Sequence, residues 1–451
     1  MAVFTVAEVC AATGGTLRQG DKGLTFAGVS TDTRSLKPGE LFVALRGETF
    51  DGHHYVVQAL EAGAAGVVVD SGVEAGEGGN VIIVNDTRKA LQNLATFHRR
   101  RFSIPIVAIT GSNGKTTTKD LTAAALASRF RVLKTEGNFN NDIGLPLTLL
   151  KLTNEHEAAV IEMGMRGLGE IAELVAVAEP TAGIVTNVGE THIELLGSLE
   201  NIARAKGELV DGIMPEGFVV LNADNSYVSA MAARAKGRVI FYGIDSPSQV
   251  TARQIRTQGL TTSFLCSCHG EEFPVEIPAV GRHNVYNSLA AIAAARELGL
   301  TAGEITSGLA SFQPSAMRQH IETRGSYTII NDAYNASPLS MASGLETLRE
   351  VADGRTVAVL GDMLELGSVA EEAHSRIGAL AAAGGVSVVV TVGSLARFIA
   401  QAATDGGAEA VACETHDKAI AELRRLLMPG DTILIKGSRG MKMEQILALF
   451  G

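Results

Sequence analysis

A turn that contains two glycines and precedes a lysine and two threonines is the first segment of the sequence that could carry chemistry. The turn follows the apolar run 104–109, and a helical pattern starts at Lys115. It reads Thr110-Gly111-Ser112-Asn113-Gly114-Lys115-Thr116-Thr117. A glycine turn between a strand and a helix aims backbone N–H groups at an anion, so we expect nucleotide phosphates here, with Lys115 on the outer phosphates and Thr116 on Mg²⁺. Ile109 replaces the first glycine of the general pattern, which leaves an ordinary strand–helix turn as the alternative.

Two further polar residues could join this site from neighbouring strands. Glu162 ends the apolar run 158–161, and His192 comes shortly after the run 183–186. Parallel strands present their carboxyl ends to one crevice, so we expect both side chains near Thr116, with Glu162 as a metal ligand. A solvated glutamate and a structural histidine are the alternatives. Lys206 lies in a helical pattern, where its residue type alone indicates a surface charge.

The elements that must position these residues fall into three stretches. Residues 1–103 contain short elements, whereas 104–315 and 316–451 alternate apolar runs with helical patterns, which predicts parallel sheets covered by helices on both faces. The fold class is therefore α/β, with 250–278 as antiparallel strands at a sheet edge and Gly299 as the stop of a helix at 285–297. Buried strands are expected at 41–45, 64–69, 81–84, 104–110, 158–161, 183–186, 218–221, 239–242, 327–331, 356–360, 386–392 and 432–435.

Composition and charge exclude several other classes of protein. The 38 basic and 49 acidic side chains give a net charge of −11, which argues against binding of duplex nucleic acid, because phosphate contacts need clustered Lys and Arg. The chain has no apolar run of about 18 residues, no signal-peptide pattern and too few cysteines for a disulfide framework, so we expect a cytoplasmic protein without a membrane span. Cys266, Cys268 and His269 lack a second ligand pair and are not expected to bind metal.

The motifs resemble those of the Mur ligase family, ATP-dependent ligases that build the peptide of the bacterial cell-wall precursor, over essentially the whole chain. The loop at 110–117 matches the family's nucleotide loop, including its missing first glycine, and further matches lie at 137–146, 187–198 and 281–287. The resemblance implies a UDP-substrate domain at 1–103, a central P-loop-type ATP-binding domain at 104–315 and a C-terminal Rossmann-like domain, for the amino substrate, at 316–451.

The resemblance also implies roles for single residues. The catalytic residues would be Lys115, His192, Lys206 and Arg318. Two Mg²⁺ ions would be held by Thr116, Glu162, His192 and Lys206, with Lys206 turned into an anionic carbamate by CO₂. ATP would contact Gly111 to Thr117 and also Asn284, Asn287, Arg318, Asp332 and Asn335. The UDP-linked substrate would contact Ser30, Thr31, Asp32, Arg34, Gly47, His53 and Asn138.

Two motifs in the third stretch resemble the family member that adds D-alanyl-D-alanine to UDP-MurNAc-tripeptide. They are 331–338, with Ser337 where asparagine is more usual, and 360–367; the Asp-Asn-Pro-Arg motif of the ligase that adds the diamino acid is absent. After a late strand come three polar residues that could bind the dipeptide carboxylate, with solvated loop side chains as the alternative: Lys436, Ser438 and Arg439.

Three residues in this stretch carry further expectations. Asp332 and Asn335 could cap the next helix instead of contacting ATP. Met317 stands before Arg318 where the family usually has glycine, so we expect a backbone there that avoids glycine-only conformations.

The reaction implied by the resemblance is amide-bond formation through an acyl phosphate. The binding and catalytic residues would come from three domains, and closure of these domains would exclude water. The chain is expected to be a monomer. Two other functions stay open. One is another Mur-type or folylpolyglutamate-type ligase, and the other is a nucleotide-binding regulatory protein without ligase chemistry.

Overall fold

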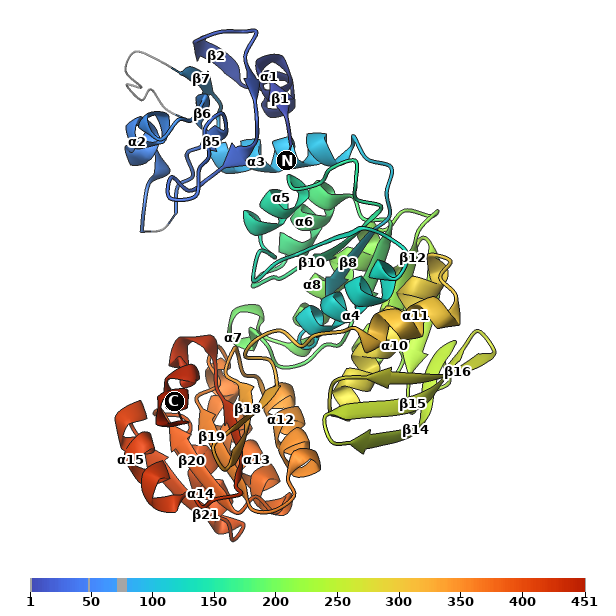
Figure 1. The fold of residues 1–451 in the computed structure, drawn as a ribbon, viewed down its shortest axis with the longest axis vertical. Coiled ribbons are helices and arrows are strands. Elements are labelled where there is room, and N and C mark those ends of the chain that lie inside the picture. The colour runs from blue at the N-terminus through green and yellow to red at the C-terminus, as the bar shows by residue number, and fades with distance from the viewer. Residues whose placement is uncertain (1, 48, 71–78, 451) are drawn as a thin grey trace.

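Three α/β domains follow one another in the computed structural model, which describes residues 2–47, 49–70 and 79–450. Figure 1 shows the N-terminal domain in blue and the C-terminal domain in orange and red at opposite ends, with the middle domain between them. The α/β class and the three-domain architecture predicted from the sequence are confirmed. The boundaries at residues 103 and 315 stay a prediction.

The N-terminal domain is built on a five-stranded sheet in the order β2-β7-β6-β5-β4, with β2 antiparallel to β7 and the other neighbours parallel. Three of these strands were expected: β5 and β6 are shorter than their apolar runs, and β7 is as long as its run but begins one residue earlier. The elements are β1 (Phe4–Thr5), α1 (Val6–Thr13), β2 (Thr16–Gln19), β3 (Thr25–Phe26), β4 (Val29–Ser30), β5 (Leu41–Val43), α2 (Val56–Glu61), β6 (Gly66–Val69), β7 (Asn80–Ile83) and α3 (Thr87–Arg99).

The middle domain contains a nine-stranded sheet in the order β16-β15-β14-β13-β12-β11-β8-β10-β9. Its central strand β8 (Ile106–Thr110) is apolar throughout because both faces are covered. Val107 and Ile109 pack into one core with helices α4 (Lys115–Ala127) and α10 (Arg282–Glu297), whereas Ile106 and Ala108 pack into another with α6 (Glu170–Ala178) and α8 (Leu199–Gly212). The predicted layers are therefore confirmed.

The other elements of this domain also follow the sequence pattern. The segment 250–278 forms β14, β15 and β16 as antiparallel strands at the sheet edge, and Gly299 follows α10 with a φ of 86°. The remaining elements are β9 (Val132–Lys134), α5 (Gly144–Leu149), β10 (Ala158–Glu162), β11 (Ala182–Val185), α7 (Ile193–Leu196), β12 (Phe218–Asn222), α9 (Ser226–Ser229), β13 (Arg238–Gly243), β14 (Val250–Gln258), β15 (Thr261–Cys268), β16 (Glu271–Ile277) and α11 (Ala302–Ala310).

The C-terminal domain has a six-stranded sheet in the order β17-β18-β22-β19-β20-β21, parallel except for β17. Helices cover both faces, as the doubly wound pattern predicts. The elements are β17 (His320–Arg324), β18 (Tyr327–Asp332), α12 (Pro338–Val351), β19 (Thr356–Gly361), α13 (Ala370–Ala383), β20 (Val388–Val392), α14 (Arg397–Asp405), β21 (Glu409–Cys413), α15 (His416–Leu426) and β22 (Thr432–Lys436).

The two junctions between domains differ in chemistry. Phe4 and Leu94 of the N-terminal domain share one apolar core with Leu149 and Ile171 of the middle domain. The C-terminal domain is joined by the segment 311–319, in which the Ser315 hydroxyl donates to Asp120 at 2.7 Å. The first junction is therefore a continuous core, and the second rests largely on polar contacts.

Two observations concern the chain as a whole. Within the described residues, no helix has the length and apolarity needed to cross a membrane. Cys266 and Cys268 are buried in β15, and burial raises the pKa of the Cys268 thiol to about 11. These thiols therefore behave as small apolar side chains of the core.

Helix α11 lies so close to α4 that only a glycine fits at one position. A Cβ on Gly308 would stand 2.4 Å from the Ala124 carbonyl oxygen. We expect Gly308→Ala to lower the free energy of unfolding by about 1–3 kcal/mol, because the two helices must separate. Gly303→Ala in the same helix meets no atom within 4 Å and should be neutral or stabilising, by up to about 1 kcal/mol. Urea unfolding followed by circular dichroism measures both, and equal effects would contradict this packing.

Candidate active site

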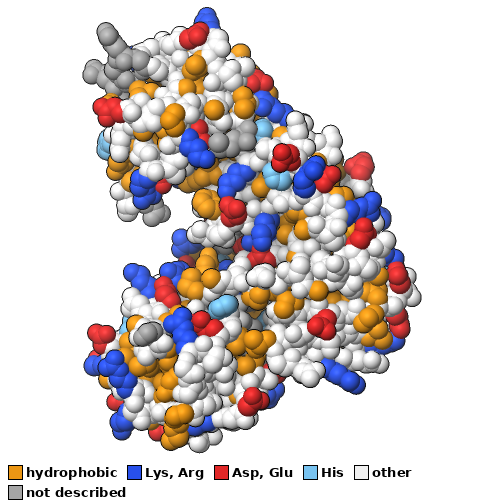
Figure 2. Space-filling model, viewed as in Figure 1, with side chains coloured by type: hydrophobic (Ala, Val, Ile, Leu, Met, Phe, Trp, Pro, Cys, Tyr) orange, Lys and Arg blue, Asp and Glu red, His pale blue; other side chains and the backbone are white. Residues whose placement is uncertain are grey.

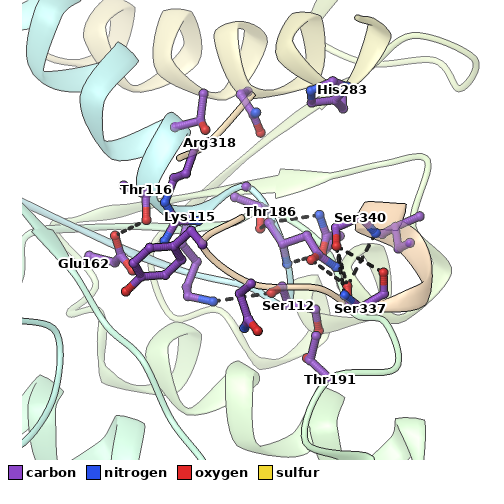
Figure 3. A pocket seen from close by; sticks show the side chains of 18 of the residues that line it. Ser112, Lys115, Thr116, Glu162, Thr186, Thr191, His283, Arg318, Ser337 and Ser340 are labelled. Carbon is purple, nitrogen blue, oxygen red and sulfur yellow. Dashed lines mark hydrogen bonds between the residues drawn. The ribbon is translucent and has the colours of Figure 1, made fainter. Parts of the chain in front are cut away.

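A cavity of about 1660 Å³ lies where the middle and C-terminal domains face one another. Its walls include the loop between β8 and α4, the ends of β10, β11 and β12, the start of α10 and the loops after β18 and β22. Figure 2 shows the hollowed side of the molecule, and Figure 3 shows polar side chains of this cavity at close range. Strand ends from two sheets therefore meet at one site.

The loop before α4 is held against the end of β11 by its backbone. Ser112 N donates to the Asn187 carbonyl oxygen at 2.9 Å, and Asn113 N donates to the Asn187 side chain at 2.9 Å. Gly111 has a φ of 150°, and a Cβ there would stand 1.8 Å from Thr186 Oγ1. Gly114 is the N-cap of α4 and has a φ of 79°. The glycines are therefore required by close approach and by conformation, as expected for a phosphate loop.

Lys115 folds back over this loop. Its ammonium donates to the Gly111 carbonyl oxygen at 2.8 Å and to that of Ser112 at 3.4 Å. Burial lowers the pKa of Lys115, and the nearby Arg318 lowers it further, while Glu162 opposes both. The half-buried Thr117 also lines the cavity. An anion in the cavity would replace carbonyl oxygens as the partner of this ammonium.

Thr116 and Glu162 meet, as the strand-end argument predicts. The Thr116 hydroxyl donates to Glu162 Oε2 at 2.8 Å, and Asn140 donates to Oε1 at 2.8 Å (Figure 3 shows the first contact). Glu162 is 1% exposed and forms no ion pair with any described residue. A buried carboxylate that has only neutral hydrogen-bond donors lacks a positive charge to balance its own, which is energetically unfavourable. A hydroxyl beside such a carboxylate suits Mg²⁺, which prefers oxygen ligands.

His192 points its Nδ1 at Glu365, a residue of the C-terminal domain. His192 has a φ of 56° at the start of α7, so a non-glycine residue adopts the left-handed conformation there. Burial lowers the pKa of His192 although Glu365 acts against this, and a neutral imidazole is the form that binds metal. The sequence motif contained Glu365 but gave no reason to pair it with His192.

Lys206 is buried within α8 rather than on the surface. It is 2% exposed, and its ammonium has no hydrogen bond or ion pair within the described residues. Burial lowers the pKa of Lys206 well below its usual value of 10.5, and repulsion from Lys115 adds to this shift. The interpretation of Lys206 as a surface charge is therefore wrong.

Asn284 and Asn287 lie on the face of α10 that packs against α4. Asn284 donates to the Val280 carbonyl oxygen at 2.7 Å, and Asn287 accepts from the Thr118 hydroxyl at 3.1 Å. Both line the cavity, but in this structure Asn287 joins α10 to α4, and Asn284 is bonded to the segment just before its own helix. Their expected contact with ATP stays a prediction.

Asp224 is a cavity residue that the sequence analysis missed. Partial burial alone would raise the pKa of this carboxyl, but hydrogen bonds from the segment 244–246 and from the Tyr286 hydroxyl hold it at about 2. Asp224 follows β12 just as Glu162 ends β10. The same strand-end argument, applied to the run 218–221, could have found it.

Arg318 lies over the ring of Tyr334, with its guanidinium carbon 3.9 Å from the ring centre. The expectation that the backbone before Arg318 avoids glycine-type conformations is wrong. Met317 has a φ of 59°, and its carbonyl oxygen accepts from Tyr334 N at 3.1 Å. This hydrogen bond and the stacked arginine hold a methionine in the left-handed region.

Asp332 is held by Lys436, the last residue of β22. The ammonium donates to Asp332 Oδ2 at 2.6 Å and to the Asn335 carbonyl oxygen at 3.0 Å. The N-cap of α12 is Ser337, so the alternative in which Asp332 and Asn335 cap that helix is wrong. Lys436 is 2% exposed, which also excludes a solvated lysine.

The other two residues expected near the dipeptide also have partners. The Ser438 hydroxyl accepts from Leu364 N at 2.9 Å, and Arg439 pairs with Glu444 at 2.9 Å. The helix that begins after Ser438 is a 3₁₀ helix of only three residues, too short to add a helix dipole to the binding of a carboxylate. With Lys436, they line the cavity, and their contact with a carboxylate stays a prediction.

The residues expected to bind a UDP-linked substrate lie apart from the cavity, except Asn138, which lines it. Asp32 pairs with Arg34 at 2.6 Å, and Arg34 holds the pKa of Asp32 at about 2. His53 lies between Asp51 and Asp70. The others occupy the same domain: Ser30, Thr31 and Gly47. The hollow in Figure 2 separates this domain from the C-terminal domain.

Comparison with known proteins identifies the family. Residues 109–295 match the family model described as Mur ligase middle domain, 318–439 match Mur ligase, glutamate ligase domain, and 25–99 match Mur ligase family, catalytic domain. The chain belongs to the Mur ligase family.

Three proteins similar to this Mur ligase span nearly its whole length. The UDP-N-acetylmuramoyl-tripeptide–D-alanyl-D-alanine ligase of Bacillus subtilis is 41% identical over 93% of this chain and 92% of its own. A crystal structure of MurF from Acinetobacter baumannii has a TM-score of 0.93 at 31% identity and covers 99% of this chain and 98% of its own. MurF from Thermotoga maritima, solved in complex with ADP, has a TM-score of 0.84 at 26% identity, over 94% and 96% of the two chains.

The close approach at Gly111 gives a direct test of the phosphate loop. We expect Gly111→Ala to weaken ADP binding at least about tenfold, because the added Cβ would collide with Thr186 and push the loop from β11. Isothermal titration calorimetry with ADP measures this loss.

The control for this test is Gly169→Ala. Gly169 also has a positive φ, of 88°, but a Cβ there would meet no atom within 4 Å. Equal affinities of the two variants would show that collision at Gly111 does not govern binding.

Proposed function

We propose that this Mur ligase joins D-alanyl-D-alanine to UDP-MurNAc-tripeptide, with cleavage of ATP to ADP and phosphate. The observation that carries the proposal is the cavity itself, in which Lys115 of the phosphate loop, the Thr116–Glu162 pair and Arg318 of the C-terminal domain line one space. Relatives named for this reaction match almost the whole chain. The protein is therefore a ligase of peptidoglycan precursor synthesis.

The reaction has two chemical steps. The tripeptide carboxylate attacks the γ-phosphate of ATP, ADP leaves, and an acyl phosphate forms. The amine of D-alanyl-D-alanine then attacks the acyl carbon, loses a proton and expels phosphate. The first step brings one anion onto another, so it needs positive charge around the transferring group. Lys115 and Arg318 would supply it.

Two Mg²⁺ ions fit the donor sets in the cavity. Thr116 and Glu162 would hold one, and His192 and Lys206 the other. When bound, Mg²⁺ neutralises charge on the phosphates and on the attacking carboxylate. Lys206 supplies an anionic ligand once its neutral amine adds to CO₂ and releases a proton to solvent, which forms a carbamate. Burial favours this step because it keeps the amine neutral.

The remaining contacts are assigned by domain. Asn284, Asn287, Asp332 and Asn335 would surround the nucleoside of ATP, and Lys436, Ser438 and Arg439 the dipeptide carboxylate. The UDP moiety would lie on the N-terminal domain at Ser30, Thr31, Asp32, Arg34, Gly47 and His53, with Asn138 on the middle domain. The hollow between domains must close for these parts to share one substrate, and closure protects the acyl phosphate from water (Figure 2).

The identity of the amine substrate distinguishes this function from the two alternatives, another ligase of the superfamily and a regulatory protein. With UDP-MurNAc-tripeptide and ATP, we expect phosphate release with D-alanyl-D-alanine, and a product whose mass shows the new amide. Release with lysine, diaminopimelate or glutamate instead would favour another Mur-type or a folylpolyglutamate-type ligase. Nucleotide hydrolysis without amide product would indicate a regulatory protein.

Two lysines should be essential for turnover. We expect Lys115→Ala and Lys206→Ala each to lower kcat about 10²–10³-fold, because each removes charge stabilisation near the transferred phosphoryl group. Added short carboxylic acids should restore activity to Lys206→Ala, by replacing the carbamate, and not to Lys115→Ala. Lys418→Ala is the control, because this exposed lysine of α15 pairs only with the exposed Glu414 among the described residues and lies outside the cavity lining. Wild-type turnover in either cavity variant would contradict the assignment.

A further inference from the structure

The loop after β19 docks directly onto the loop that carries His192. Glu365 and His192 have φ values of 61° and 56°, so two non-glycine residues in left-handed conformations face one another across the domain junction. Their side chains are hydrogen-bonded, and Glu194 N donates to the Glu365 carbonyl oxygen at 3.2 Å. Unfavourable backbone conformations on both sides of one contact persist only where surrounding structure holds them, and such positions gather at functional sites.

Both oxygens of the Glu365 carboxylate are used, and both partners belong to the middle domain. Oε2 contacts His192 Nδ1, and Oε1 accepts from Arg166 at 3.1 Å. Arg166 follows β10 and His192 follows β11, so this one side chain spans the ends of two strands. The carboxylate cannot rotate without breaking one of these contacts.

The contact decides which nitrogen of His192 is free. A neutral imidazole has one N–H, and a carboxylate at Nδ1 holds the proton there. Nε2 then carries the lone pair, and no hydrogen bond to it is formed by any residue that the structure describes. A carboxylate behind a metal-binding histidine fixes its ring orientation and strengthens it as a ligand.

The loop that carries Glu365 is fixed to the core of the C-terminal domain. Leu364 N donates to Ser438 Oγ at 2.9 Å, and Met363 N donates to the buried His374 at 2.9 Å. Asp362 accepts from Leu395 N and Ala396 N. Glu365 therefore moves with its whole domain.

We propose that Glu365 is a positioning residue that orients His192 for metal binding only when the C-terminal domain is docked. The inference rests on the proposed function, in which His192 holds a metal ion. It makes the metal site dependent on domain position, so that a part of the catalytic centre is completed by docking. If Glu365 only held the two domains together, its removal would change neither the tautomer nor the metal affinity of His192.

The tautomer of His192 is the first readout. Full-length protein with ¹⁵N-labelled histidine is studied by long-range ¹H–¹⁵N NMR, with the His192 signals assigned by their loss in His192→Ala. We expect the Nδ1–H tautomer in the wild type and in Glu365→Gln, whose amide oxygen still accepts, and a mixture in Glu365→Ala. An Nε2–H tautomer in the wild type would overturn the proposal.

Metal affinity is the second readout. Mn²⁺ is titrated by EPR into the full chain with ADP and bicarbonate, and the relevant site is the one that His192→Ala abolishes. We expect Glu365→Ala to weaken that site about 10–100-fold and Glu365→Gln to weaken it less. Arg376→Ala breaks another ion pair across the same junction, to Glu190 at 2.5 Å, and should change the affinity less than about twofold.

The outcomes separate this inference from the proposed function. Unchanged Mn²⁺ affinity in Glu365→Ala, or an equal loss in Arg376→Ala, would overturn the role of Glu365. Neither measurement needs the dipeptide or the UDP-linked substrate. A wild-type protein that fails to ligate D-alanyl-D-alanine but shows the expected tautomer and affinities would refute the proposed function alone.

Discussion

Repulsion among cations held in one cleft is the constraint on which the site depends. Burial lowers the pKa of both Lys115 and Lys206; repulsion from Lys115 adds to the shift of Lys206, and Arg318 acts on Lys115 in the same direction although Glu162 opposes it. Among the described residues, Glu162, the buried carboxylate beside them, accepts side-chain hydrogen bonds only from neutral groups. Like charges in a poorly solvated space raise the free energy of the folded state, and an anionic ligand with its metal ions removes that cost. The free energy of nucleotide binding therefore includes the relief of this repulsion.

The sheet order explains why these groups can lie so close together. β8 lies between β10 and β11, so the loop that leaves it toward α4 is flanked by strand ends that turn to other connections. This is where a doubly wound sheet opens a crevice. The backbone must pass within contact of Thr186 on one side and of Asn287 on the other, which only Gly111 and Gly114 permit. At these two of the chain's 50 glycines, the residue type therefore has a geometric cause.

Local pattern predicted the fold and one half of the site. The apolar runs of the central strands arise because both faces are buried, and the meeting of Thr116 with Glu162 follows from parallel strands alone. The pairing of His192 with Glu365 could not be predicted, because the two residues lie in different domains and neither neighbourhood specifies the other. Lys206 looked like a surface charge because a helical pattern does not show which face is covered. Met317 was misjudged because tertiary contacts outweigh the local preference for glycine.

The two domain junctions indicate which part of the molecule moves. The N-terminal domain shares a continuous apolar core with the middle domain, and α3 is anchored there by Arg99, which donates to the Ala178 carbonyl oxygen at 3.1 Å. The C-terminal domain meets the middle domain mainly through ion pairs and hydrogen bonds, with Ile193 as an apolar contact. Polar interfaces exchange partners with water at little cost, whereas opening a shared core exposes apolar surface. The hollow is therefore closed most easily by rotation of the C-terminal domain, which is also the domain that carries Arg318, Asp332 and Glu365.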